Sequence, residues 1–148
     1  MAGKSSISTA ELWARLFKVP SVGTFLNEQS GDELPAFSDY IARLADEAGM
    51  KHEAVIARAG IERSYGHRLF NGTRKPSRDT VIKLAFGFGC ECDGAQQLLK
   101  VAGAGALHPK VKRDAVIAYC LHNGLSLVDA QGLLCEYDLP LLGGDKHG

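Results

Sequence analysis

The sequence predicts an all-α protein. Apolar residues recur at steps of three and four along most of the chain, as on one face of an α-helix, and no stretch alternates strictly between apolar and polar residues. Glycine and proline separate these periodic stretches, and several of the stretches begin with side chains that cap helices. The 148 residues, 45% of them hydrophobic, are enough to bury a core without the help of metal or disulfides.

Residues 1–34 are expected to form a short helical hairpin and a linker. Ser8 and Glu11 have the spacing of a capping box, which predicts the start of the first helix. That helix ends at Pro20, after which Ser21 is placed to cap a second short helix. The first helix carries an apolar stripe of Leu12, Trp13, Leu16 and Phe17.

Residues 35–105 are expected to form a body of five helices with short connections. Glycine is placed to end several of them, as at Gly72, because glycine adopts the left-handed backbone conformation at low cost. Ser77 is placed to cap the fourth helix. The expected helices cover about residues 37–48, 52–59, 62–71, 78–88 and 93–102.

Residues 106–148 are expected to form a C-terminal extension with helices over about 110–122 and 128–137 and a disordered tail after Leu142. A capping-box pattern at Ser126 precedes the second of these helices. The extension offers more apolar surface than a five-helix body requires, and we interpret most of this surface as intramolecular core and the remainder as the candidate face of a dimer. It comprises Val111, Ala115, Ile117, Ala118, Leu121, Leu125, Leu133, Leu134 and residues 139–142.

The formal charge of the chain is zero, from 17 basic and 17 acidic residues, but the charges are unevenly distributed. Residues 58–83 hold seven basic and two acidic side chains, a local charge of +5, whereas residues 1–57 carry −3 and residues 84–148 carry −2. A cationic segment between acidic flanks is compatible with contact to phosphates. Such a run of charge is also common on ordinary solvated surfaces, which is the alternative interpretation.

The four cysteines predict neither a metal site nor a disulfide framework. Cys90 and Cys92 form a single C-x-C pair, whereas a zinc site usually needs two pairs at wider spacing. Together with Cys120 and Cys135, we interpret them as small apolar side chains, buried or half-buried, in a reducing compartment. No apolar stretch has the length of a membrane span or a signal peptide, so we expect a cytoplasmic protein without cofactor.

The central body contains the order of elements that a DNA-binding helix-turn-helix requires: a short helix, a tight glycine turn, a second short helix, an Asn-Gly end and a basic loop. In the segment 49–61 and in the spacing from Gly60 to Gly72 to Pro76, the chain resembles the phage-repressor or Cro-type (XRE-type, lambda-repressor-like) helix-turn-helix family. The resemblance covers about residues 37–89. The C-terminal extension has only a faint similarity to helical extensions of uncharacterised bacterial regulators, which implies no function.

The resemblance implies a five-helix body in which a helix over about residues 62–70 enters the major groove. Base contacts would then come from Glu62, Arg63, Ser64, His67 and Arg68, residue types that can donate to or accept from base edges. Phosphate contacts would come from His52, Arg74, Lys75 and Arg78. For each of the two histidines, an ordinary surface position is the alternative interpretation.

Three positions depart from the family pattern. The family usually has a small residue where this chain has Ile56, and a branched apolar residue where it has Gly66. Because these two positions pack against each other across the turn, we hypothesise that Ile56 fills the space left at Gly66. Lys51 also stands where the family prefers a Ser or Thr cap.

These patterns predict a transcriptional regulator that binds double-stranded DNA by sequence, as a homodimer on a palindromic operator. We do not expect an enzyme, because no recognised spacing of catalytic acids, bases or nucleophiles is present. The alternative function is a protein-interaction or dimerisation module that uses the helix-turn-helix fold as a scaffold. In that case the C-terminal helices would contact a protein partner, because a fold alone does not determine a function.

Overall fold

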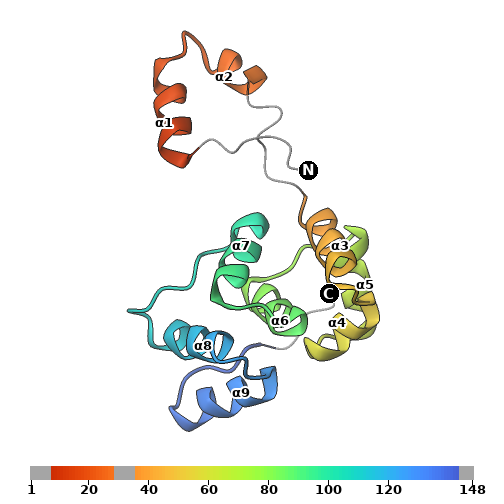
Figure 1. The fold of residues 1–148 in the computed structure, drawn as a ribbon. Helices are drawn as coiled ribbons and strands as arrows, with labels where there is room; N and C mark the ends of the chain where they lie inside the picture. Colours follow the sequence, from red (N-terminus) through yellow and green to blue (C-terminus); the bar gives the residue numbers. More distant parts are fainter. Residues whose placement is uncertain (1–7, 29–35, 144–148) are drawn as a thin grey trace. The chain divides into compact units, whose positions relative to one another are not determined.

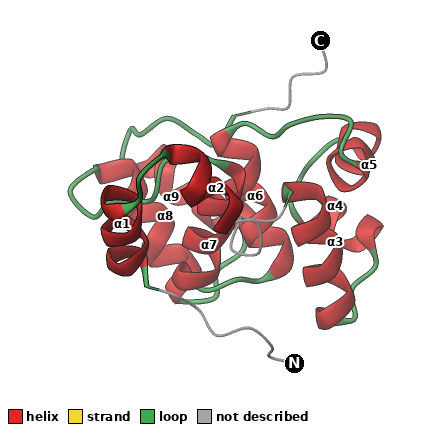
Figure 2. Ribbon diagram, turned by 90° about the horizontal axis from the view of Figure 1, so that it is seen from above, coloured by secondary structure: helices red, strands yellow, loops and turns green. Residues whose placement is uncertain are grey.

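The structure of the chain is a computed structural model that describes residues 8–28 and 36–143 (Figure 1). Within these residues it contains helices joined by loops and no strand (Figure 2), so the all-α prediction is confirmed. The chain divides into two compact units, residues 1–34 and residues 35–148, and each is described by itself. The helices are α1 (Thr9–Lys18), α2 (Val22–Glu28), α3 (Phe37–Ala48), α4 (His52–Arg58), α5 (Arg63–Asn71), α6 (Arg78–Phe88), α7 (Cys92–Ala102), α8 (Lys112–His122) and α9 (Leu127–Glu136).

Side-chain caps begin the helices where the sequence predicts them. The Ser8 hydroxyl accepts a hydrogen bond from the N–H of Glu11, and the Glu11 carboxylate accepts one from the N–H of Ser8, both at 3.1 Å. The hydroxyls of Ser21 and Ser77 each accept a bond from the N–H three residues further on. A second capping box begins α9 at Ser126. These contacts confirm the predicted starts of four helices.

The C-terminal extension differs from the prediction at its first helix. Helix α8 begins at Lys112 rather than near residue 110. A turn precedes it, in which the N–H of Lys110 donates to Nδ1 of His108, so this segment is not yet helical. The predicted disordered tail falls largely on residues 144–148, which lie outside the described residues. Gly143, the one residue of that tail that is described, donates its N–H to the carboxylate of Asp79, and Leu142 before it is buried.

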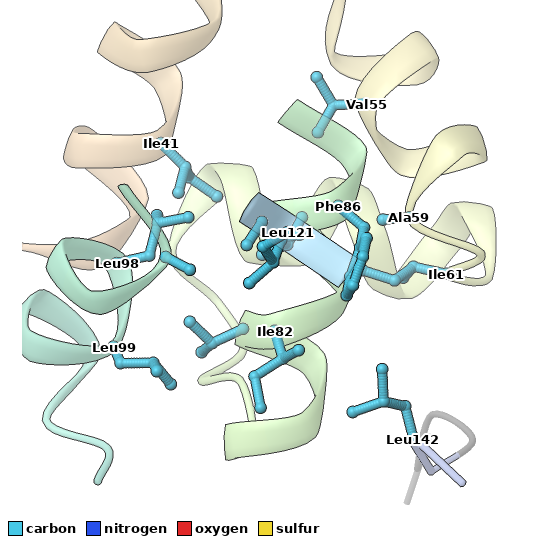
Figure 3. Packing of buried hydrophobic residues seen from close by; sticks show 14 of the residues in the cluster. Ile41, Val55, Ala59, Ile61, Ile82, Phe86, Leu98, Leu99, Leu121 and Leu142 are labelled. Carbon is cyan, nitrogen blue, oxygen red and sulfur yellow. The ribbon is translucent and has the colours of Figure 1, made fainter. Parts of the chain in front are cut away.

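Helix α6 is the centre of the second unit. All residues from Thr80 to Gly87 are buried, which requires a helix that is covered on every side. Figure 3 shows Ile82 and Phe86 of α6 among labelled side chains from α3, α4, α7 and α8. The residues that the sequence assigns to the core of the helix-turn-helix, namely Val55, Ala59, Ile61 and Leu69, are all buried, and this assignment is confirmed.

The C-terminal extension shares this core. Ile117 and Leu121 of α8 and Leu134 of α9 are buried. After α9 the chain returns to the core with Leu142, whose backbone N–H donates to the side chain of Gln131 and whose carbonyl accepts from it. Intramolecular packing therefore accounts for these apolar residues of the extension, and α8 and α9 are structural neighbours of the helix-turn-helix rather than an appended arm.

An ion pair fastens the extension to the start of α6. Arg113 of α8 donates hydrogen bonds to both oxygens of the Asp79 carboxylate, at 2.9 and 3.0 Å, and others to the carbonyls of Pro140 and Leu141. The same carboxylate accepts the N–H of Gly143 at 2.8 Å. Partial burial raises the pKa of Asp79, but the hydrogen bonds from Arg113 and Gly143 outweigh burial and hold this pKa below its ordinary value.

Asp79→Asn is expected to remove an acid-sensitive part of the stability. Because folding lowers the pKa of Asp79, its carboxylate stabilises the fold above about pH 4, and this contribution is lost as the pH falls through the folded value. The variant should be less stable than the wild type near neutral pH, and the difference should shrink in acid. Urea denaturation over this pH range measures the difference, with Asp46→Asn at an exposed carboxylate as the control. A difference that does not change with pH contradicts the assignment.

Candidate nucleic-acid interface

A tight turn sets the angle between α4 and α5. Gly60 has a φ of +64°, in the left-handed region that favours glycine, and a Cβ at this position would lie 2.9 Å from Leu127 of α9. Ala59 and Ile61 on either side are buried, and the N–H of Ile61 donates to the carbonyl of Ile56 at 3.1 Å. Backbone conformation, core packing and the contact with α9 therefore all hold the turn in one geometry.

Ile56 and Gly66 pack against each other as the sequence hypothesis requires. Ile56 is 2% exposed, and a Cβ built at Gly66 would lie 2.6 Å from two of the side-chain carbons of Ile56. This distance is shorter than carbon atoms tolerate, so a side chain at position 66 cannot coexist with Ile56 in its present place. Helix α5 continues through Gly66 from Arg63 to Asn71.

Glu62 begins α5 as its N-cap. Its carboxylate accepts hydrogen bonds from the N–H groups of Ser64 and Tyr65, at 2.8 and 2.9 Å, and a negative charge is favourable at a helix N-terminus. The sequence predicts a base contact for Glu62 and misses this cap, because Ser, Thr, Asp and Asn are the usual N-cap residues. The carboxylate is held against the backbone, so its first role in this structure is to start the helix.

Four side chains of α5 lie on one face of the helix. Their spacing, i, i+1, i+4 and i+5, places them together, and they line an open hollow in the surface with Glu62. Three of them are exposed and the fourth, His67, is half-buried. We call this surface the α5 face, and it consists of Arg63, Ser64, His67 and Arg68. The structure thus brings together all five residues predicted to contact bases, four on the α5 face and Glu62 at its start.

Glu53 of α4 belongs beside the α5 face, although sequence reasoning does not identify it. Its carboxylate accepts a hydrogen bond from Arg63 at 2.8 Å and lies 3.7 Å from Nε2 of His67. The hydrogen bond and the positive charge of Arg63 lower the pKa of Glu53. The pair holds the guanidinium of Arg63 at the surface, where its side chain is 76% exposed. The sequence feature that could have identified Glu53 is its position in the first turn of α4, which lies opposite the start of α5.

Aromatic rings of α5 position two of the predicted phosphate contacts. The imidazole of His52 stacks on Phe70, with 4.0 Å between the ring centroids and 11° between the ring planes. The guanidinium of Arg74 lies over the ring of Tyr65, 5.7 Å from its centroid, at a distance suitable for a cation–π contact. Lys75 follows Arg74 and is exposed. These three side chains flank α5, one at the start of α4 and two in the loop after α5.

Arg78, the fourth predicted phosphate contact, is engaged within the unit. Its guanidinium donates two hydrogen bonds to the carboxylate of Asp114 in α8, at 2.9 and 3.2 Å. It also donates to the carbonyls of Gly105 and Ala106 in the loop between α7 and α8. With four of its donor bonds already made to protein, Arg78 has a structural role that the sequence did not indicate, and we leave it out of the proposed phosphate contacts.

The basic residues of the segment 58–83 do not form a single cationic surface. Lys83 is 4% exposed and donates to the carbonyl of Gly143. Arg58 lines a separate pocket between α4 and the loop that joins α8 to α9. With Arg78 also engaged, three of the seven basic residues serve other parts of the structure. The four that remain around α5 are Arg63, Arg68, Arg74 and Lys75.

The geometry of α4 and α5, two short helices joined by a tight glycine turn with one face of the second helix exposed, is that of a helix-turn-helix. Residues 36–97 match the family model described as "Helix-turn-helix domain". We refer to these residues as the helix-turn-helix segment. It begins just before α3 and includes α4, α5 and α6. The chain matches no curated protein and no solved structure.

The described residues contain no group of three or more His, Cys, Asp or Glu placed to hold a metal ion. Burial raises the pKa of the Cys90 thiol to about 11, as expected for a small apolar side chain rather than a ligand. Cys92 is half-buried and Cys120 is buried, but Cys135 is exposed on the outer side of α9, which corrects its interpretation as a buried residue. In the described part of the chain, no helix has the length and apolar character needed to cross a bilayer.

Proposed function

We propose that this protein is a transcriptional regulator that binds double-stranded DNA by sequence, with α5 in the major groove. The α5 face carries this proposal, because its exposed polar side chains lie on a helix whose angle is set by a rigid turn. The match of residues 36–97 to a helix-turn-helix domain supports DNA binding as the class of function.

The chemistry of the α5 face suits the edges of base pairs. Arg63 and Arg68 can each donate two hydrogen bonds to O6 and N7 of guanine, and Ser64 can donate to or accept from several bases. Arg74 and Lys75 supply positive charge for phosphates at the C-terminal end of α5, so they would set affinity rather than sequence preference.

The proposal includes a cytoplasmic protein that acts as a homodimer on an inverted-repeat operator. A two-fold pair of helix-turn-helix segments would contact two half-sites about one helical turn of DNA apart, roughly 34 Å. The symmetry of the protein would then require a palindromic site.

Selection of genomic DNA fragments by the purified protein tests the proposal. We expect enrichment of fragments that share a short motif, and an affinity for that motif that falls with salt. If about two phosphates are neutralised per chain, by Arg74 and Lys75, the slope of log affinity against log salt should be about −2 per chain. A selection that enriches no motif contradicts sequence-specific binding.

A protein-interaction module is the second candidate function. The observation that favours it is an apolar groove between α7 and α8, lined by Leu107, Pro109, Ala115 and Ala118, with Tyr119 beside it at 60% exposure. Co-purification of a stoichiometric protein partner, lost in Ala118→Glu, together with a failed DNA selection, would favour this function. In Arg68→Glu, which leaves the groove unchanged, the same partner should still be retained.

Glu53→Gln is expected to weaken sequence discrimination and to strengthen non-specific binding. The substitution removes a negative charge next to the α5 face and the ionic partner that orients Arg63 at 2.8 Å. We expect the ratio of affinities for selected and scrambled DNA to fall by roughly tenfold, which is at the lower end of what one arginine–guanine contact contributes. Competition binding with both DNAs measures this ratio. Glu47→Gln, which removes an exposed charge from α3, should leave it unchanged.

A further inference from the structure

The first unit leaves large apolar side chains exposed. Helices α1 and α2 have ten and seven residues, and none of their described side chains is buried. Isolated helices of this length are marginal in water, so their stability requires packing of an apolar face. The exposed fractions are 55% for Trp13, 76% for Phe17, 64% for Val22 and 60% for Leu26. A surface of this kind on a small unit indicates an interaction site.

The exposed residues of α1 form a regular stripe. Ala10, Trp13, Ala14 and Phe17 follow one another at i, i+3, i+4 and i+7, so they share one face of the helix, and all four are exposed. The rings of Trp13 and Phe17 stack with 5.7 Å between their centroids, which makes one continuous aromatic surface. We call these four residues the α1 stripe. Leu12 and Leu16 lie beside it and are half-buried, in a hairpin where α1 contacts α2.

We propose that the α1 stripe binds the α1 stripe of a second copy of this chain, with the two helices antiparallel. Helix α1 spans Thr9–Lys18, so an antiparallel pair centred on the helix places Trp13 opposite Ala14 of the second copy and Ala10 opposite Phe17. Each large ring then meets a small side chain, and the two-fold axis repeats both contacts. A parallel pair would instead place ring against ring and alanine against alanine. The stripe is therefore complementary to itself in one orientation only.

The charges of α1 favour the same orientation. Glu11 lies in its first turn, and Arg15 and Lys18 lie in its last turn. In an antiparallel pair the acidic end of each helix lies beside the basic end of the other. The two helix dipoles are also antiparallel, which is the favourable arrangement. In a parallel pair like charges would be adjacent. Charge complementarity thus supports a second copy as the occupant of the stripe.

The exposed area favours a weak dimer rather than a permanent one. An aromatic side chain buries about 150–250 Å², so the exposed fractions of Trp13 and Phe17 leave on the order of 250 Å² uncovered in each copy. Two copies would contribute on the order of 500 Å² from these rings, against roughly 1,200–2,000 Å² for a stable interface. The alanines of the stripe, Val22 and Leu26 add apolar area, so we expect a dimer that dissociates on dilution.

Sedimentation of the full chain, without DNA, against concentration tests the pairing. The wild type should change from monomer to dimer over the micromolar range, and Ala14→Glu should raise the dissociation constant by roughly tenfold or more, because it places a charge against Trp13 of the second copy. Ala14 is exposed and glutamate is a good helix former, so this change should not unfold α1. Thr9→Glu adds the same charge to α1 outside the stripe and, in the antiparallel pair, opposite Lys18 of the second copy, so it should not weaken the pairing.

Disulfide cross-linking tests the orientation independently of the measured affinity. In a Cys135→Ser chain, which lacks the exposed native thiol, Ala14→Cys should form a covalent dimer because residue 14 lies near the two-fold axis. Lys18→Cys should not, because antiparallel pairing separates the two copies of residue 18 by about nine residues, roughly 13 Å. A wild type that stays monomeric, or a dimer that Ala14→Glu leaves intact, overturns the proposal. Neither outcome bears on DNA binding by the α5 face, so the pairing of α1 and that part of the proposed function fail separately.

Discussion

Replacing Arg63 and Arg68 together by alanine is expected to abolish sequence-specific DNA binding and to leave the fold intact. An arginine that donates two hydrogen bonds to guanine discriminates between bases by roughly 10- to 100-fold, so the double variant should lose about 10²- to 10⁴-fold in affinity for a selected site. Affinity for unrelated DNA should fall much less, because only two charges are removed. Both side chains are exposed, so their truncation should change the helix content little.

Fluorescence anisotropy with selected and scrambled duplexes measures this loss at a fixed salt concentration. The matched control is Lys110→Ala with Lys112→Ala, which removes two exposed positive charges from the C-terminal extension and preserves the α5 face. Circular dichroism confirms that each variant is folded. If both double variants lost the same affinity for the selected duplex, Arg63 and Arg68 would act through charge alone. An equal loss of affinity for the selected and the scrambled duplex would likewise contradict a base-reading role.

Ile56→Ala is expected to cost roughly 2–5 kcal/mol of unfolding free energy. Ile56 is 2% exposed, and its side chain occupies the space beside Gly66, where no second side chain is present to relax into the cavity. The cavity would lie between the two helices of the helix-turn-helix, so the variant should also loosen the angle of α5. Val128→Ala, at a residue that is 79% exposed, should change the stability by less than about 0.5 kcal/mol.

A second substitution separates lost packing from a general weakening of α4. Gly66→Val alone would place its Cβ 2.6 Å from Ile56 and should destabilise the wild type by about 1–3 kcal/mol. In the Ile56→Ala chain the same substitution fills the cavity and should restore part of the loss, so the two changes together should cost less than their sum. Urea denaturation of the four chains gives this coupling. A cost for Ile56→Ala below about 1 kcal/mol, or additive effects, would reject the exchange of volume between the two positions.

The helices were predictable because the interactions that begin and end them are local. The capping bonds at Ser8, Ser77 and Ser126 join residues three positions apart, and the left-handed end at Gly72 depends on one residue's own backbone. The partnership of Ile56 and Gly66 was also predictable, since a known packing contact combined with two unusual residue sizes leaves one way to fill the space. Hydrophobic periodicity then indicated which face of each helix is buried.

The candidate site was predictable only in part, because the sequence shows which residues are charged but not which of them form ion pairs in the folded chain. Glu53 and Arg63 are ten residues apart, and their contact depends on the angle at which α4 and α5 cross. Arg78 and Asp114 are 36 residues apart, and only the return of α8 to the core brings them together. The cap at Glu62 was missed for a different reason, since glutamate is an uncommon N-cap residue.

By itself the sequence determined the all-α class, the order of elements in the helix-turn-helix and the residue types on the α5 face, because each depends on periodicity, capping and spacing within a few residues. Only the tertiary structure decided which basic residues remain near α5 and which, like Arg78 and Lys83, bind the C-terminal extension. The physical reason is that the three-dimensional neighbours of a charged side chain determine whether it is buried, ion-paired or exposed. A net charge summed along the chain contains no information about them.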